Sequence, residues 1–388
     1  MRRACAVLVA FAAAGVVALP AQAAGPRGTL RVEHRLSGLP YVEGSVTYLR
    51  VGQAGRVVAR RSRASLRLTL KRRLAPGRYR AGSLQRPCAG NCSMLDPPRD
   101  RCSRRVRVFA GETTVVRAVT RPGRGCRMRV RRPAAFPPAR RIRALRRWVR
   151  GRTGSSFALI DTHGRLHGFQ PRRRYVSASV VKAMLLVGYL RRIGNRRPSA
   201  SERAVLGPMI VRSDNDAAST IYRQVGDAGL LALAQRAGMR DLTVAGYWGS
   251  VFFSAADQAR FFRRFDALVP RRSRSYARRL LASIVPRQSW GFSRFSLRAG
   301  WATFLKGGWR GTAAGRLVHE AALFERRGRR FSLAVLSDGN RSHAYGTATL
   351  RGAARRIFGR RRNAPRPRPA SAPARETAAG RSGRRTTA

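Results

Sequence analysis

Lysine is almost absent from this very basic sequence. The 388 residues include 81 lysines and arginines, yet only Lys71, Lys182 and Lys306 are lysines. A buried lysine can lose its proton and act as a base, whereas the guanidinium group of arginine stays charged. Because arginine is accepted almost everywhere else, we expect the remaining lysines to lie where a guanidinium group cannot replace the amine.

Histidine is also scarce, and one common catalytic motif is missing. The five histidines are isolated except for His163 and His167, which a predicted turn separates. A helical pair of zinc ligands is therefore not expected there. The sequence has no G-x-S-x-G segment, which argues against a nucleophile elbow of the α/β-hydrolase type. We expect no metal and no other cofactor.

Only the N-terminus has a long apolar run. Met1-Arg2-Arg3 is positively charged, residues 4–19 are apolar, and Ala21-Gln22-Ala23 has the small-x-small pattern of a cleavage site. This order predicts a signal peptide over residues 1–23, with a first core strand or helix as the alternative. Because the run is short for a membrane span, we expect a secreted, extracytoplasmic protein without a transmembrane span after cleavage.

Cysteine is rare but clustered. Cys5 would leave with the signal peptide, and Cys88, Cys92, Cys102 and Cys126 remain. In an oxidising compartment four such residues predict two disulfides, with three possible pairings. A zinc site built from all four thiolates is the alternative.

The formal net charge of +64 raises the question of nucleic-acid binding. Arginine is scattered through every predicted element, and no basic motif interleaved with aromatic residues is present. We therefore expect no nucleic-acid partner. Such a surface would still attract anionic polymers of a cell envelope in a salt-dependent way.

The chain divides by composition into five parts. After the signal peptide, residues 25–130 predict a small β-sandwich domain, and residues 131–140 form a proline-rich linker. Residues 141–360 mix helical and strand patterns in a way that predicts an α+β domain. Residues 361–388 are rich in proline, alanine and arginine, which predicts a disordered basic tail. The predicted sandwich strands are Thr29–Glu33, Ser45–Val51, Ser65–Leu70 and Thr113–Val119.

Ser179 and Lys182 form the first chemical motif of the α+β region. A helix-favouring run follows them, so the serine should lie at a helix start, with the lysine three residues on and on the same face. A serine hydroxyl needs a neighbouring base to become a nucleophile, and a desolvated lysine can be that base. A surface helix that carries S-x-x-K by chance is the alternative.

Two further motifs follow in order. Ser213-Asp214-Asn215 lies between predicted helices, where a hydroxyl can pass a proton and a carboxamide can bind an amide substrate, although a simple helix cap is equally expected. Lys306-Gly307-Gly308 ends a predicted strand. Its lysine can hold a carboxylate, and glycines let a ligand approach the backbone; a plain loop is the alternative.

Together the three motifs resemble the S-x-x-K, S-D-N and K-T-G set of class A β-lactamases and penicillin-binding proteins. The resemblance covers residues 140–358. It implies that Ser179 is acylated with help from Lys182. It also implies that Ser213 relays a proton and that Asn215 and Lys306 bind the substrate. The backbone N–H groups of Ser179 and Trp309 would form the oxyanion hole.

The sequence departs from that family in three ways. Gly307 replaces the usual threonine or serine, so a hydroxyl for the substrate carboxylate is missing. The segment between Ser179 and Ser213 is short, which predicts a reduced helical domain. No glutamate lies between Glu202 and Glu320, so the family's deacylating base is missing.

These observations favour a serine hydrolase that forms an acyl-enzyme with β-lactams or D-alanyl amides of peptidoglycan stems. Hydrolysis of that acyl-enzyme should be slow, because Asp241 is the only acid in residues 239–254 and is more typical of a turn or cap. The alternatives are a penicillin-binding DD-peptidase and a non-catalytic cationic protein that binds cell-wall polymers.

Overall fold

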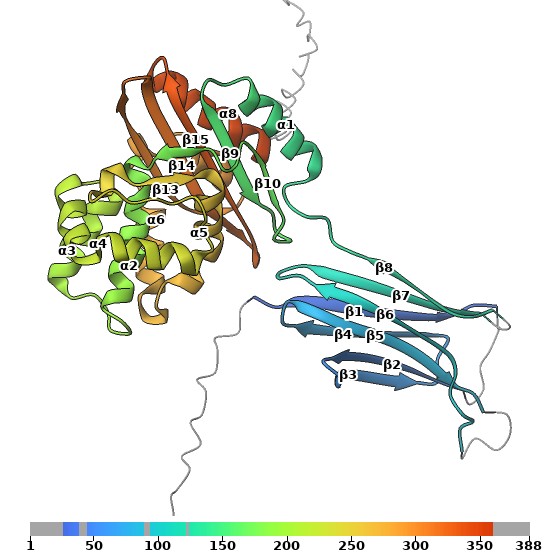
Figure 1. Cartoon of the computed structure of the whole chain (residues 1–388). Helices are drawn as coiled ribbons and strands as arrows, with labels where there is room; N and C mark the ends of the chain where they lie inside the picture. The colour runs from blue at the N-terminus through green and yellow to red at the C-terminus, as the bar shows by residue number, and fades with distance from the viewer. Residues whose placement is uncertain (1–25, 39–44, 89–93, 122–123, 360–388) are drawn as a thin grey trace, which may run out of the picture.

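The computed structural model describes residues 26–38, 45–88, 94–121 and 124–359. The predicted signal peptide (with Cys5), Cys92 and the predicted basic tail lie outside these residues. Within the described ranges, no helix is long and apolar enough to cross a membrane. An N-terminal region of β strands is followed by a mixed region of helices and strands (Figure 1).

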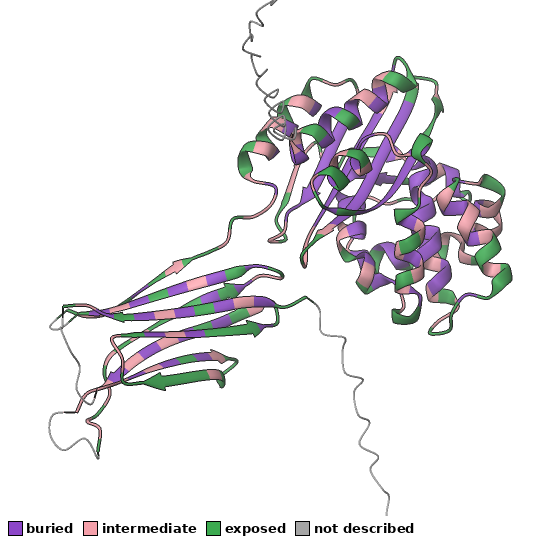
Figure 2. Cartoon of the chain, turned by 180° about the vertical axis from the view of Figure 1, so that it is seen from behind, coloured by how far each residue is buried: buried purple, intermediate pink, exposed green. Residues whose placement is uncertain are grey.

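The N-terminal strands form two four-stranded sheets that share one core. The strand orders are β4-β1-β7-β8 and β3-β2-β5-β6. Successive side chains of a strand point to opposite faces, so buried and exposed residues alternate along most of these strands (Figure 2). The buried sides of the two sheets meet in a single apolar cluster. The bounds are Gly28–Leu36 (β1), Val46–Gln53 (β2), Arg56–Arg63 (β3), Arg67–Leu74 (β4), Gly77–Arg86 (β5), Arg99–Val108 (β6), Thr113–Arg121 (β7) and Gly125–Arg131 (β8).

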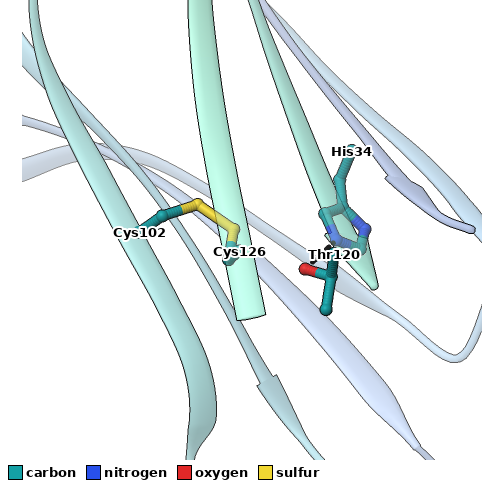
Figure 3. Close-up of a disulfide and its surroundings, with 4 residues drawn as sticks. All are labelled: His34, Cys102, Thr120 and Cys126. Carbon is teal, nitrogen blue, oxygen red and sulfur yellow. Dashed lines mark hydrogen bonds between the residues drawn. A yellow bond between two sulfur atoms is a disulfide. The ribbon is translucent and has the colours of Figure 1, made fainter. Parts of the chain in front are cut away.

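A disulfide joins the two sheets of this sandwich. Cys102 on β6 is bonded to Cys126 on β8, and the two strands belong to different sheets (Figure 3). Cys88 is also disulfide-bonded. Because two of the four sulfurs are used in the Cys102–Cys126 bond, this structure is incompatible with a zinc site built from all four thiolates. Near the same end of the sandwich, the buried His34 ring bonds the Thr120 hydroxyl at 3.1 Å (Figure 3).

Three arginine-rich strands, β3, β6 and β8, were not expected from the sequence. The apolar residues of β3 and most of β6 give no clear alternation, and every residue of β3 except Ala59 is exposed, whereas β8 alternates Cys126, Met128 and Val130 with arginines. These strands form because partners on a neighbouring strand satisfy their backbone groups, which composition does not reveal. The predicted fold class, a disulfide-containing β-sandwich before an α+β domain, is confirmed.

The α+β region is built on one antiparallel sheet of order β10-β9-β15-β14-β13. Its strands are Ser155–Ile160 (β9), Leu166–Phe169 (β10), Ala302–Thr312 (β13), Gly315–Arg326 (β14) and Arg329–Asn340 (β15). The sequence predicted that a strand ends at Lys306. In the structure β13 continues six residues further, because both glycines after the lysine pair with β14.

Helices cover both faces of this sheet, whose central strands are almost entirely buried (Figure 2). On one face, α1, α7 and α8 pack against side chains such as Leu333 and Val335 of β15. On the other, α5 and α6 pack against the sheet, and α2, α3 and α4 pack against these helices and one another, in a cluster that includes the alternate residues Ala334 and Leu336. The helices are Ala139–Arg150 (α1), Lys182–Arg192 (α2), Ala200–Val211 (α3), Asn215–Ala237 (α4), Ala255–Leu268 (α5), Arg274–Ala282 (α6), Phe292–Arg298 (α7) and His343–Phe358 (α8).

Local signals place the helix ends near the site. The predicted capping box of Ser199 and Glu202 starts α3. The two helices predicted over 217–225 and 230–237 are one element, α4, with non-helical backbone at Gly226. Between α3 and α4 only Arg212, Ser213 and Asp214 remain, so the S-D-N motif lies in the tight connection between two helices.

Candidate active site

The serine of the first motif lies in a 3-10 turn, Ala178–Val181, that runs directly into α2. Ala178 has a φ of 44°, a left-handed conformation that is strained for a residue with a side chain. Ser179 is buried to 9% exposure. A strained backbone position next to a buried serine is typical of a functional site.

The Lys182 amine is the centre of a polar network. It donates to the Ser213 carbonyl oxygen at 2.6 Å and to Asn215 Oδ1 at 2.7 Å, and it lies 3.4 Å from Ser213 Oγ. Its Nζ also lies 4.7 Å from the centre of the Trp248 ring. Removing the amine would leave the buried Ser213 carbonyl without this donor, at a cost of about 1–3 kcal/mol, and would also remove a part-buried bond to Asn215.

The second lysine reaches the same serine from the sheet. Lys306 is fully buried on β13, and its Nζ donates to Ser213 Oγ at 3.0 Å and to the Gly307 carbonyl at 2.9 Å. Ser213 has a φ of 61°, so it too has a left-handed conformation that is uncommon for a residue with a side chain. Its hydroxyl is therefore in contact with both amines, which is the geometry that a proton relay requires.

The connection between α3 and α4 serves two purposes. The Asp214 carboxylate accepts from the Ala217 N–H at 2.9 Å and caps α4. Ser213 and Asn215, on either side of it, bond Lys182 instead. The helix-cap alternative is thus correct for the middle residue only.

Gly308 brings the lysine strand against the serine turn. A Cβ atom added at Gly308 would lie 2.9 Å from the backbone nitrogens of both Ser179 and Val180. Only a glycine permits this approach. The structure thus brings Lys182, Ser213, Asn215 and Lys306 into one network and packs Gly308 against Ser179. Within the described residues, the Ser179 hydroxyl itself has no hydrogen-bond partner.

Burial makes both amines weaker bases than an ordinary lysine. It lowers the pKa of Lys182 to about 8, and a smaller opposing effect comes from the charge of Asp214. Burial, followed by repulsion from Lys182, lowers the pKa of Lys306 well below its ordinary value. Two ammonium groups around one hydroxyl favour loss of a proton. A neutral amine beside a serine is the state that can accept a proton.

Asp241 is not free to act as a base. Arg172 donates to its Oδ1 at 2.7 Å, and the Ser254 hydroxyl donates to Oδ2 at 2.7 Å. These bonds lower the pKa of the Asp241 carboxyl, against the effect of its burial. Both bonds come from side chains of other segments, so the carboxylate links those segments to its own. The side chain from this loop that does reach Lys182 is the indole of Trp248.

Trp290 occupies the space beside Gly307. A Cβ atom at Gly307 would lie 2.9 Å from the Trp290 ring, so the hydroxyl residue of the K-T-G pattern could not be placed there without displacing the indole. The Trp290 ring also packs edge-on against Trp309 at 5.2 Å and against His343 at 5.2 Å. Trp309 is therefore in an aromatic cluster at this end of β13.

A buried carboxyl holds the Trp290 segment in place. Glu320 lies opposite Gly307 in the register of β13 and β14. It accepts from the backbone N–H groups of Trp290 at 3.0 Å and Phe292 at 3.2 Å. Burial raises the pKa of Glu320 to about 7. Trp248, Trp290 and Glu320 were missed from the sequence, because none of them belongs to a motif and each acts through a contact distant along the chain.

His163 and His167, the pair of histidines considered as zinc ligands, each have a carboxylate partner. His163 Nε2 lies 2.9 Å from Glu112, and His167 Nε2 lies 2.9 Å from Asp161. In the part of the chain that the structure describes, no group of three or more histidine, cysteine, aspartate or glutamate side chains is arranged to hold a metal ion.

Two buried lysines bond the Ser213 hydroxyl, and Ser179 lies at the start of a neighbouring helix. In an α+β fold this arrangement is typical of enzymes that become acylated on a serine. Comparison with known proteins agrees. Residues 196–360 match the model of the β-lactamase enzyme family, a range that includes the second and third motifs but begins after Lys182. None of the curated proteins compared matches this chain.

Several solved structures are similar to it. A class A β-lactamase from Mycobacterium abscessus is 18% identical, with 56% of this chain and 97% of that chain covered and a TM-score of 0.47. A β-lactamase from Sphaerobacter thermophilus is 14% identical, with 56% of this chain and 95% of that chain covered and a TM-score of 0.48. A structure described as PBP-A is 17% identical, with 58% of this chain and 97% of that chain covered and a TM-score of 0.48. The match to the family model supports the resemblance to β-lactamases and penicillin-binding proteins that the motifs predicted.

Proposed function

We propose that this protein is an extracytoplasmic serine enzyme that forms an acyl-enzyme on Ser179 with β-lactams or with D-alanyl amides of peptidoglycan stems. The observation that carries the proposal is the network in which Lys182 and Lys306 both bond Ser213, with Gly308 packed against Ser179. No other lysine lies in the α+β region, although arginine is frequent there.

Each residue of the network has a role in this proposal. Lys182, with its lowered pKa, accepts the proton of Ser179 as the hydroxyl attacks the amide carbonyl. Ser213 passes a proton to the leaving nitrogen, and Lys306 attracts the substrate carboxylate. Asn215 binds the substrate amide. The N–H groups of Ser179 and Trp309 stabilise the oxyanion.

Release of the acyl group is slow in this proposal. The loop that should supply a carboxylate base instead places Trp248 beside Lys182 and binds Asp241 to Arg172 and Ser254. Without a carboxylate to activate water, the acyl-enzyme should persist. That behaviour favours a penicillin-binding peptidase over an enzyme that destroys antibiotics quickly.

The test is to incubate the protein with a fluorescent penicillin and to follow intact mass with time. A long-lived adduct on Ser179 supports the proposal, and a transient adduct with free product indicates a β-lactamase. Wild-type protein that behaves like Ser179→Ala at every concentration would remove the enzymatic function.

The lysines supply a matched control. Lys182→Arg should reduce acylation about 100-fold or more, because a guanidinium group cannot become neutral and accept the serine proton. Lys71→Arg replaces the exposed lysine on β4 and should leave the rate unchanged. Equal rates for both variants would show that a neutral amine at position 182 is not needed.

A further inference from the structure

A second, unassigned cleft lies where the sandwich meets the α+β region. It has a volume of about 860 Å³. The sandwich contributes the β2–β3 turn and the outer face of β5 and β6, and the other wall comes from the segment before α1 and the β9–β10 turn. These two walls are joined by contacts between the regions: Phe109 stacks on His163 at 3.8 Å, and Glu112 pairs with both His163 and Arg329.

The cleft is lined by seven arginines. They are Arg56, Arg78, Arg80, Arg105, Arg107, Arg132 and Arg165. All seven are exposed to solvent. Among the described residues that line the cleft, there is no aspartate or glutamate. Glu112 and Asp161, which lie close in sequence to the lining residues Phe109 and His163, are buried and paired with other side chains.

Four of these arginines face each other in strict register. Arg78 on β5 is opposite Arg107 on β6, and Arg80 is opposite Arg105. Because residues directly opposite in an antiparallel pair have Cβ atoms about 5 Å apart, and next-but-one residues share a face, the four side chains form one cationic square. Like charges placed directly opposite destabilise a sheet.

Nothing in the described protein neutralises this square. None of the four guanidinium groups has an ion pair with a described residue. Arg80 donates to the Ser103 hydroxyl at 3.1 Å, and Arg107 lies over the Phe109 ring at 5.5 Å. These contacts orient the side chains and leave their charge uncompensated. An anion in the cleft would remove the repulsion.

Phosphate is the anion that this geometry suits. The planar guanidinium fork binds phosphate oxygens in pairs, and several forks at the spacing of a β-sheet can follow a chain of phosphates. The cleft offers no free ring for a nucleic-acid base to stack on. Phe109 and His163 stack on each other, and Tyr79 is buried in the sandwich core. The ligand is therefore a phosphate chain without bases.

We infer that this cleft binds a linear polyol-phosphate polymer and so holds the α+β region close to an anionic wall material. The inference rests on the proposed extracytoplasmic location but not on catalysis, because no residue of the cleft belongs to the site around Ser179.

The test measures binding of the full-length protein to a poly(glycerol phosphate) chain of about twelve units in 0.15 M salt, by isothermal titration. The cleft variant changes Arg78, Arg80, Arg105 and Arg107 to Gln. The matched control makes the same change at four exposed arginines outside the cleft, Arg72, Arg73, Arg143 and Arg146, so that the net charge of both variants is equal.

The cleft variant should bind at least tenfold more weakly, whereas the control should lose no more than about threefold, because exposed charges beyond a Debye length of about 8 Å are screened. The salt dependence of binding should also be less steep in the cleft variant. Both variants should keep the far-UV circular dichroism spectrum and the cooperative thermal unfolding of the wild type, which shows that they are folded.

Three outcomes would overturn the inference. The first is an equal loss of affinity in both variants, which indicates a diffuse electrostatic field. The second is tighter binding of a single-stranded oligonucleotide with the same number of phosphates, which indicates a nucleic-acid site. The third is equal binding of polyglutamate, which shows no preference for phosphate. If the cleft variant does not fold, Arg132→Gln with Arg165→Gln on the opposite wall should still weaken binding at least threefold, and unchanged binding would refute the site.

Discussion

The rate of acylation should depend on pH through the Lys182 amine. Burial lowers the pKa of Lys182 to about 8, so the neutral form becomes more abundant as the pH rises through that value. If this amine takes the proton of Ser179, only the neutral form is competent. The acylation rate constant at saturating β-lactam should therefore rise with pH and level off above about pH 9.

The size of the effect follows from the titration. With a pKa of about 8, about one amine in eleven is neutral at pH 7 and about ten in eleven at pH 9. The rate constant should therefore increase about tenfold between these values. An unperturbed lysine, with a pKa of 10.5, would still be less than about a tenth neutral at pH 9, so its rate would continue to rise beyond that pH.

The assay is stopped-flow fluorescence with a fluorescent penicillin, at several concentrations for each pH. This separates the acylation rate constant from the dissociation constant, which should instead follow the charge of Lys306. Ser179→Ala gives the background from spontaneous opening of the β-lactam ring at high pH. A rate constant that is flat from pH 6.5 to 9.5 would refute the role of Lys182 as the base.

Three further results test the packing around the site. Gly308→Ala should reduce acylation at least tenfold and lower the melting temperature, because the added Cβ would lie 2.9 Å from the backbone of the serine turn. The control Gly311→Ala, on the same strand, should have little effect, because its Cβ would meet only a flexible arginine side chain at 3.4 Å. Equal effects of the two variants would contradict the close approach. Gly307→Thr alone should slow acylation, because the new side chain would meet the Trp290 ring. Combined with Trp290→Ala, it should make acylation by penicillins about tenfold or more faster than in Trp290→Ala alone, because one hydrogen bond to a charged group is worth at least that factor. A double variant no faster than Trp290→Ala alone would show that the missing hydroxyl does not limit the reaction. The bond from Arg196 is the main reason that the pKa of Glu202 is lowered to about 2, so its stabilisation is complete above its ordinary value of 4.5 and is lost as the pH falls towards 2. Thermal unfolding of Glu202→Gln should therefore differ most from wild type at neutral pH, and a difference that does not shrink in acid would contradict this.

The sequence predicted the parts of the fold that depend on local signals. The capping box at Ser199, the helix stop at Gly151 and the strands rich in apolar residues are all present where they were expected. The strands β3 and β6 could not be predicted, because their pairing depends on neighbouring strands rather than on their own alternation, whereas the alternation of β8 was present in the sequence and was missed. The same reason explains why β13 was cut short at Lys306, where two glycines weaken the strand pattern.

The site followed a similar division. Motif order was enough to choose the two lysines, Ser213 and Asn215, which the structure places in one network. Motifs carry no information about side chains that reach the site from distant segments. Trp248 over Lys182 and Trp290 beside Gly307 are both contacts of this kind, and only the three-dimensional structure reveals them.

Those two tryptophans bear on the fate of the proposed acyl-enzyme. The indole of Trp248 lies against the Lys182 amine, and we propose that it keeps a hydrolytic water molecule away from that side of the amine. An acceptor amine that approaches from the side on which the leaving nitrogen departed does not need the space beside Lys182 that Trp248 occupies. By microscopic reversibility, it can return its proton through the Ser213 hydroxyl, which both lysines contact. If the acyl-enzyme forms as proposed, we therefore expect transfer of the acyl group to an amine to be favoured over transfer to water.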